Sequence, residues 1–213
     1  MKNTLESNKV SVTGVINSEF KFSHAVFGEN FYTASLSVKR LSGNVDIIPL
    51  MVSERLIDVA NDYSGYTVEV DGQFRSYNHY DGQKNRLVLS VFAQDVKFLE
   101  GFNDYAGINR IVLDGYICKE PIYRKTPLGR EIADILLAVN RDYKKSDYIP
   151  CIIWGRNARF ASRFEIGTKV RICGRIQSRE YSKKVSDDEF EVRTAYEVSI
   201  MKMEVLKDDK RED

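Results

Sequence analysis

The sequence predicts an all-β chain made of two tandem copies of one small β-barrel, and three observations lead to this prediction. The segment 8–16 reappears as 109–117. A shift of about 100 residues exceeds the ~20 to 50 residues of a solenoid repeat, so it indicates a duplicated domain. Apolar and polar residues alternate along the repeated segments, as they do in half-buried strands. Each copy also holds one short amphipathic segment in the same place.

The first element of each copy is expected to be a strand, at 8–16 and at 109–117. Apolar residues occupy alternate positions in both segments, which is the period of a strand with one buried face. Gly14 and Gly115 fall inside these strands and suggest a bulge or a tight bend at the same point of each copy.

A long hairpin is expected next, after a loop that ends in a turn signal at 27–30 and at 126–129. The connector between the arms differs between the copies. It is a short glycine-containing turn at 41–44, whereas its counterpart at 142–146 is basic and aromatic. The arms of the two hairpins are expected at 31–40 and 45–52, and at 132–141 and 148–154.

A short helix is expected at 53–60 and at 157–164, because the apolar residues of both segments fall on one helical face. A second hairpin follows in each copy, and Gly72 and Gly174 mark bends within its first strand. The strands of these hairpins are expected at 67–77 and 87–98, and at 168–181 and 190–205. Strand, hairpin, helix and hairpin is the order of a Greek-key barrel of the OB type. We therefore expect two tandem five-stranded OB-fold barrels, each with one short helix.

The expected domains are residues 8–100 and 108–206, joined by a short linker and followed by a charged C-terminal end at 207–213. Hydrophobic residues make up 43% of the chain, which is enough for packed cores. No apolar run is long enough to span a membrane, and the N-terminus does not resemble a signal peptide. Three cysteines are an odd number and match no zinc pattern, so reduced core thiols in a cytoplasm are expected.

The charge is distributed unevenly between the two halves. Residues 1–100 carry 10 basic and 12 acidic residues, and residues 101–213 carry 22 and 19. The second half is therefore the cationic one, and a polyanion should prefer it.

The second copy resembles the bacterial single-stranded DNA-binding protein family over nearly its whole length. Five stretches carry the resemblance, in the order and near the spacing of that family: 109–115, 121–129, 136–141, 148–155 and 170–179. The first copy resembles the family mainly through the internal repeat, and we expect it to be a diverged relative.

The resemblance implies sequence-independent binding of single-stranded DNA in replication, recombination or repair, in a bacterial or phage protein associated with the nucleoid. That family usually assembles four barrels, so a homodimer of this two-barrel chain is expected. It also usually ends in a Gly/Pro/Gln-rich tail and an acidic tip closed by Pro-Phe, which recruits replication and repair proteins. The present sequence stops at Asp213 without such a tip, which puts recruitment through it in doubt.

Binding of this kind needs aromatic faces for bases and a basic track for phosphates. The family places base-stacking aromatics where this chain has Tyr143, Tyr148, Trp154 and Tyr181. The competing interpretation is that these rings belong to the barrel core. The candidate phosphate contacts are Arg124, Arg141, Lys144, Lys145, Arg156 and Arg179, although any one of them can be an ordinary surface charge.

The first copy offers Tyr77, Tyr80 and Arg40 as candidate contacts. It has Ile47 and Ser53 at the positions that match Tyr148 and Trp154, so its third strand lacks the stacking pair. We expect this barrel to bind DNA more weakly or mainly to serve assembly.

No catalytic motif occurs in the sequence, so neither an enzyme nor a cofactor, a metal or a small-molecule substrate is expected. The acidic run 187–189 is interpreted as a solvated loop. Two other functions remain open. One is a primosome-type OB adaptor that mainly binds a replication protein, and the other is an accessory domain of an RNA-processing enzyme.

Overall fold

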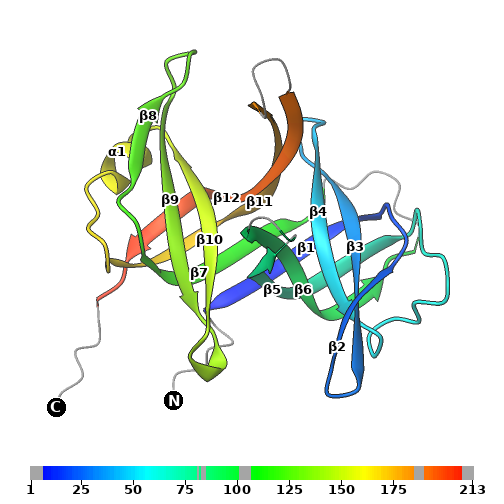
Figure 1. Cartoon of the computed structure of the whole chain (residues 1–213). Coiled ribbons are helices and arrows are strands. Elements are labelled where there is room, and N and C mark those ends of the chain that lie inside the picture. The colour runs from blue at the N-terminus through cyan, green and yellow to red at the C-terminus, as the bar shows by residue number, and fades with distance from the viewer. Residues whose placement is uncertain (1–6, 81, 83–84, 101–106, 185–189, 208–213) are drawn as a thin grey trace.

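The structure, a computed structural model, describes residues 7–80, 82, 85–100, 107–184 and 190–207, and these residues form two β-barrels side by side (Figure 1). The strands of the first barrel are β1 (Asn8–Ile16), β2 (Lys21–Val26), β3 (Glu29–Lys39), β4 (Val45–Ser53), β5 (Thr67–Tyr80) and β6 (Asn85–Phe98). The elements of the second are β7 (Asn109–Ile117), β8 (Ile122–Lys125), β9 (Glu131–Asn140), the 3₁₀ turn η2 (Asp142–Lys144), β10 (Ser146–Trp154), α1 (Arg156–Ala161), β11 (Lys169–Lys184) and β12 (Phe190–Val205).

Both barrels have the same strand pairing, which confirms the predicted all-β OB-type fold. In the first barrel β1 pairs with β3 and β5, β3 pairs with β4, β5 pairs with β6, and a parallel pairing of β4 with β6 closes the barrel. In the second barrel β7, β9, β10, β11 and β12 repeat this scheme, again with a parallel closure between β10 and β12.

Each barrel has one strand more than the five expected. β2 pairs with β3, and β8 pairs with β9, where the sequence suggested only a loop. All residues of both extra strands are exposed. A strand that buries neither face has no alternation of apolar and polar residues, which is why the sequence pattern does not reveal it.

The predicted bends at Gly72 and Gly174 are β-bulges. The register of β5 against β6 shifts between Asp71 and Gly72, and that of β11 against β12 shifts between Cys173 and Gly174. A Cβ atom at Gly72 would lie 2.2 Å from the carbonyl oxygen of Phe92, and one at Gly174 would lie 2.3 Å from that of Ser199. Only glycine permits this close approach of two strands.

The expected helix is present in the second barrel and absent from the first. Residues 54–60 form turns, and the prediction of a helix at 53–60 was wrong. Side chains bond to nearby backbone groups in this segment: the N–H of Arg55 donates to Ser53 Oγ, and the N–H of Ala60 donates to Asp58 Oδ1. Such local bonds compete with helical hydrogen bonds. In α1, by contrast, Ala158 and Ala161 are buried and anchor the helix on its barrel.

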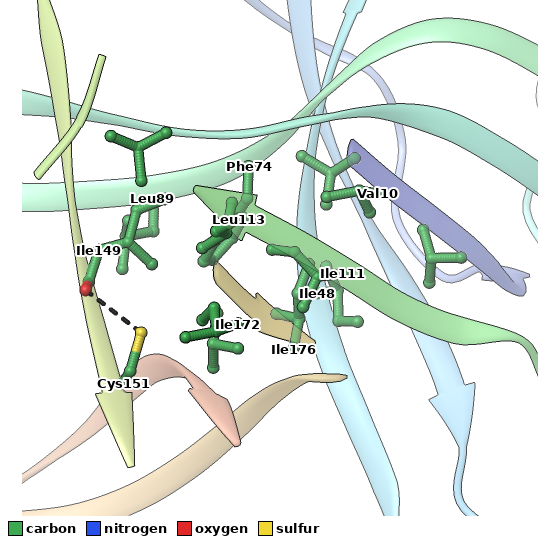
Figure 2. Close-up of a cluster of buried hydrophobic side chains, with 14 of the residues drawn as sticks. Val10, Ile48, Phe74, Leu89, Ile111, Leu113, Ile149, Cys151, Ile172 and Ile176 are labelled. Carbon is green, nitrogen blue, oxygen red and sulfur yellow. Dashed lines mark hydrogen bonds between the residues drawn. The ribbon is translucent and has the colours of Figure 1, made fainter. Parts of the chain in front are cut away.

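The buried side chains of the two barrels form one continuous apolar cluster. Figure 2 shows part of this cluster, in which Phe74 of the first barrel lies near Leu113 of the second. The buried thiol of Cys151 belongs to it, and all three cysteines are free. No helix of the described residues is long and apolar enough to cross a membrane.

The barrels are joined along their first strands. β1 pairs antiparallel with β7, and Val10 lies opposite Ile111. The second hairpin of each barrel also reaches the other barrel, because β5 contacts β10 and β11 contacts β4 (Figure 1). We propose that the two domains comprise residues 8–100 and 108–206. The linker at 101–106 and the charged end from 208 onward lie outside the described residues.

Candidate nucleic-acid interface

Two of the predicted stacking residues lie on the outer face of β10. Tyr148 and Trp154 are 46% and 40% exposed, whereas Ile149 and Ile153 point into the core and are fully buried. The two rings are six residues apart on one strand, so their attachment points lie roughly 20 Å from each other. Neither ring is a core residue.

Tyr143 projects from η2, at the tip of the β9–β10 hairpin. Its side chain is 95% exposed. Both Tyr143 and Lys144 have positive φ angles, of 61° and 56°, in the left-handed region that non-glycine residues rarely adopt. The backbone therefore holds an aromatic side chain in solvent next to Lys144 and Lys145, which are also exposed.

Tyr181 lies within β11, and the prediction that this strand ends at Tyr181 was wrong. The β11–β12 hairpin extends to Lys184 and Phe190, and only 185–189 remain between its arms. Tyr181 is 38% exposed, and the guanidinium carbon of Arg179 lies 5.9 Å from the centre of its ring. A basic group and an aromatic face are thus adjacent on this hairpin.

The predicted arginines differ in how firmly they are held by carboxylates. Arg124 and Arg179 lie 2.8 Å from Asp134 and 3.7 Å from Glu197, and both side chains are about half exposed. The Arg124–Asp134 pair is exposed, and such pairs contribute only about 0 to 1 kcal/mol, so Arg124 can exchange its carboxylate for a phosphate. Glu197 is buried and also accepts a hydrogen bond from Gln177, whereas the guanidinium of Arg179 is half exposed. Arg141 instead lies 3.3 Å from Asp147, which is fully buried.

Lys144, Lys145 and Arg156 form no ion pair with any residue that the structure describes, and all three are exposed. These three side chains are therefore available to bind phosphate. Arg156 begins α1, next to Gly155 and Trp154.

The candidate contacts of the first barrel are placed differently. Tyr77 is 41% exposed on β5, and the side chain of Tyr80 lies outside the described residues. Arg40 donates two hydrogen bonds to the buried Asp46, and this contact raises the pKa of the guanidinium. Arg40 therefore has a structural partner. Ser53, at the position that matches Trp154, is buried and donates to Glu29.

The structure also brings together a pair of residues on the first barrel, one basic and one aromatic. The guanidinium of Arg75 on β5 lies over the ring of Phe92 on β6, 3.8 Å from its centre. Both residues line a groove of about 630 Å³, together with Phe22 and His24 of β2. Only the register of β5 against β6 reveals this pair, because the two residues are far apart in the sequence.

Among the described residues no group of three or more His, Cys, Asp or Glu side chains is arranged to hold a metal ion. The acidic run 187–189 lies outside the described part of the chain.

Comparisons with known proteins find similarity to one family in the second barrel. The model of the "Single-strand binding protein family" matches residues 108–206. "Single-stranded DNA-binding protein 2" of Listeria innocua is 38% identical over 81 residues, which cover 35% of this chain and 51% of the relative. "Single-stranded DNA-binding protein A" of Bacillus subtilis is 36% identical over 84 residues, covering 36% and 49%. The chain thus spans about half the length of the curated relatives it matches.

Solved structures extend the likeness of fold to both barrels. A deletion mutant of the single-stranded DNA binding protein from Thermus aquaticus superposes with a TM-score of 0.72 at 21% identity. The superposition covers 97% of this chain and 98% of the other. At this identity the match establishes the shared two-barrel fold.

Proposed function

We propose that this protein binds single-stranded DNA without sequence choice, in replication, recombination or repair, because residues 108–206 match the model of the single-strand binding protein family. One observation carries the proposal. Four aromatic side chains at the expected stacking positions are 38% to 95% exposed on the second barrel, and lysines without carboxylate partners among the described residues lie beside the most exposed of them.

In the proposed mechanism the aromatic side chains bind bases, and the basic side chains bind phosphates. Bases stack on Tyr143, Tyr148, Trp154 and Tyr181, and each stacked base contributes about 1 to 3 kcal/mol. Phosphates lie along the lysines and arginines, and the release of counterions from the strand favours binding. Stacking is tolerant of sequence because every base has a π-face, which accounts for binding without sequence choice.

We further propose that two chains associate, because the family resemblance implies four barrels per assembly and each chain has two. Sedimentation or light scattering of the protein with and without oligo-dT measures this directly. A monomer with DNA bound would contradict the homodimer. Interaction with replication or repair proteins and association with the nucleoid are part of the same proposal.

The chain contains a single tryptophan, so its fluorescence reports on one position of the interface. Titration with oligo-dT is expected to quench Trp154, while a double-stranded DNA of equal length serves as the control. Absence of both quenching and binding would favour the alternative of an adaptor that binds a replication protein.

A further inference from the structure

The two barrels differ at one pair of repeat-related positions on their second hairpins. In the second barrel Gln177 donates a hydrogen bond of 2.7 Å to Glu197. The repeat places Arg75 at the position of Gln177, and the register of the bulged hairpins places Phe92 at the position of Ser199. The first barrel thus has a cation and an aromatic ring where the second has two neutral polar residues, Gln177 and Ser199.

Phe92 belongs to a series of rings in contact across three strands. The ring of His24 on β2 stacks on Phe31 of β3, with centres 5.2 Å apart and planes 13° from parallel. Phe31 in turn lies 5.7 Å from Phe92, whose face is covered by the guanidinium of Arg75. Bases stack on aromatic rings and on guanidinium planes alike, so this series is suited to a nucleobase.

The groove beside these rings is open and lined by further aromatic side chains. It holds about 630 Å³, and its walls include Phe22, His24, Tyr77 and Phe92. Phe22 and Tyr77 are 62% and 41% exposed. A groove of this size accommodates a base with its sugar, since ligand sites generally hold ~300 to 1,000 Å³.

Two arginines from different barrels meet at this groove. Arg75 and Arg141 line it together, and both also line a neighbouring groove of about 290 Å³ that includes Tyr143 and Lys145 of the second barrel. Arg75 bonds to Gln73 and forms no ion pair with a carboxylate of the described residues. Burial, and secondly the nearby charge of Arg141, lower the pKa of Arg75, and these effects outweigh the opposite effect of Asp147 and Asp142. An anion placed between the two guanidinium groups would relieve their repulsion.

The position of the site is fixed by the contact between the barrels. Ser76 lies between Arg75 and Tyr77 on β5, and its backbone N–H donates a hydrogen bond of 2.6 Å to Asp147 of β10. Since successive residues of a strand point to opposite faces, Arg75 and Tyr77 share the face that Ser76 does not.

We propose that the groove around Phe92 binds one nucleotide of a single strand, with its base against the aromatic rings and its phosphate between Arg75 and Arg141. The strand then passes from Tyr143 over the junction and onto the first barrel. This inference rests on the proposed function. It gives the first barrel a base site on β5 and β6, although β4 has no aromatic pair.

A tryptophan placed in the groove tests the proposal. In a Trp154→Phe background, the substitution Phe22→Trp puts the only indole of the chain into the groove, and oligo-dT of about 32 nucleotides is long enough for two barrels at up to ~16 nucleotides each. Quenching of this indole is expected. The matched control is Tyr66→Trp in the same background, because Tyr66 is also exposed but precedes β5 and lies about 36 Å along the strand from Tyr77. No quenching is expected there.

The double substitution Arg75→Gln and Phe92→Ser gives the first barrel the residues of the second. We expect it to weaken binding of the 32-nucleotide strand about tenfold, the equivalent of one stacked base, and to leave binding of a strand of about 8 nucleotides unchanged. The single substitutions Arg75→Gln and Phe92→Leu repeat the test if the double variant does not fold.

The outcomes separate this inference from the proposed function. Binding of the long strand with no quenching at position 22 and no loss in the substituted variants would overturn the inference, while quenching of Trp154 in the natural sequence would still support the function. Failure of the natural protein to bind either strand would overturn both.

Discussion

The side chain of Asp147 in the second barrel accepts a hydrogen bond from the backbone of Ser76 in the first, and Ser76 in turn accepts one from the residue after Asp147. Asp147 Oδ1 accepts the bond from the Ser76 N–H at 2.6 Å, and Ser76 Oγ accepts one from the N–H of Tyr148 at 2.8 Å. The repeat-related residues make the reciprocal contact. Asp46 Oδ1 accepts from the N–H of Ser178 at 2.8 Å, and Ser178 Oγ accepts from the N–H of Ile47 at 3.0 Å.

Both aspartates of this contact are fully buried, and each is paired with an arginine of its own barrel, Arg40 or Arg141. Buried carboxylates are tolerated only when they are paired and hydrogen-bonded. The duplicated barrels are thus joined by two equivalent polar contacts in addition to the β1–β7 pairing, and a rigid junction follows.

The first prediction concerns this junction. Asp147→Ala should lower the free energy of unfolding by about 1 to 3 kcal/mol, because it leaves the buried N–H of Ser76 without an acceptor. Unfolding in urea measures the change. Asp134→Ala is the matched control, since Asp134 pairs with the exposed Arg124 and its loss should change stability by only about 0 to 1 kcal/mol. Equal losses in the two variants would contradict a structural role for the Asp147–Ser76 contact.

The second prediction concerns Trp154. Trp154→Ala should weaken binding of oligo-dT by roughly 5- to 150-fold, the range that corresponds to the loss of one stacked base. Trp154→Phe retains an aromatic face and should lose less. Because the ring is 40% exposed, neither change is expected to unfold the protein. Fluorescence anisotropy of a labelled oligonucleotide gives both affinities, and unchanged affinity in Trp154→Ala would remove this residue from the interface.

The third prediction compares the two barrels. Tyr77→Ala and Tyr80→Ala should each weaken binding less than Trp154→Ala does, because the first barrel lacks the aromatic pair on its third strand. The same anisotropy titration ranks the three variants. A loss from either tyrosine as large as that from Trp154 would show that the barrels contribute equally.

The fourth prediction concerns salt. Affinity should fall as the salt concentration rises, with a slope of about 0.7 for each phosphate contact on a single strand. Replacing both Lys144 and Lys145 with glutamine should therefore reduce the slope by about 1.4. Lys97→Gln is the control, since Lys97 lies on the first barrel within 4.0 Å of the carboxylates of Glu69, Asp71 and Asp95, and three negative charges around it disfavour a phosphate. Binding that does not change between low and moderate salt would argue against phosphate contacts altogether.

The fifth prediction concerns pH. Burial raises the pKa of the Cys151 thiol well above its ordinary value of 9.0. The folded protein therefore keeps a proton that the unfolded chain releases, so stability should fall as the pH rises through the ordinary pKa. The free energy of unfolding, measured between about pH 7 and pH 10, should decline less steeply in Cys151→Ala than in the natural protein. Parallel curves for the two proteins would contradict this explanation.

The sequence alone determined the duplicated barrels, because each core strand buries one face and therefore alternates apolar and polar residues, as Val10 and Val12 or Ile111 and Leu113 do. The sequence also predicted bends at the glycines where both bulges lie. The family resemblance predicted that the four aromatic residues of the second barrel bind bases. The positions of those rings in the fold, 38% to 95% exposed, came from the structure.

Only the tertiary structure decided the rest. β2 and β8 bury no side chains, so their sequences show no alternation of apolar and polar residues. Turns replace the expected helix at 54–60 because of local side-chain hydrogen bonds, which the spacing of apolar residues does not reveal. The contact of Asp147 with Ser76 and that of Arg75 with Phe92 depend on how barrels and strands are aligned in space. Local sequence encodes which face of a strand is buried, whereas the partners that meet across a junction are set by the packing of the whole chain.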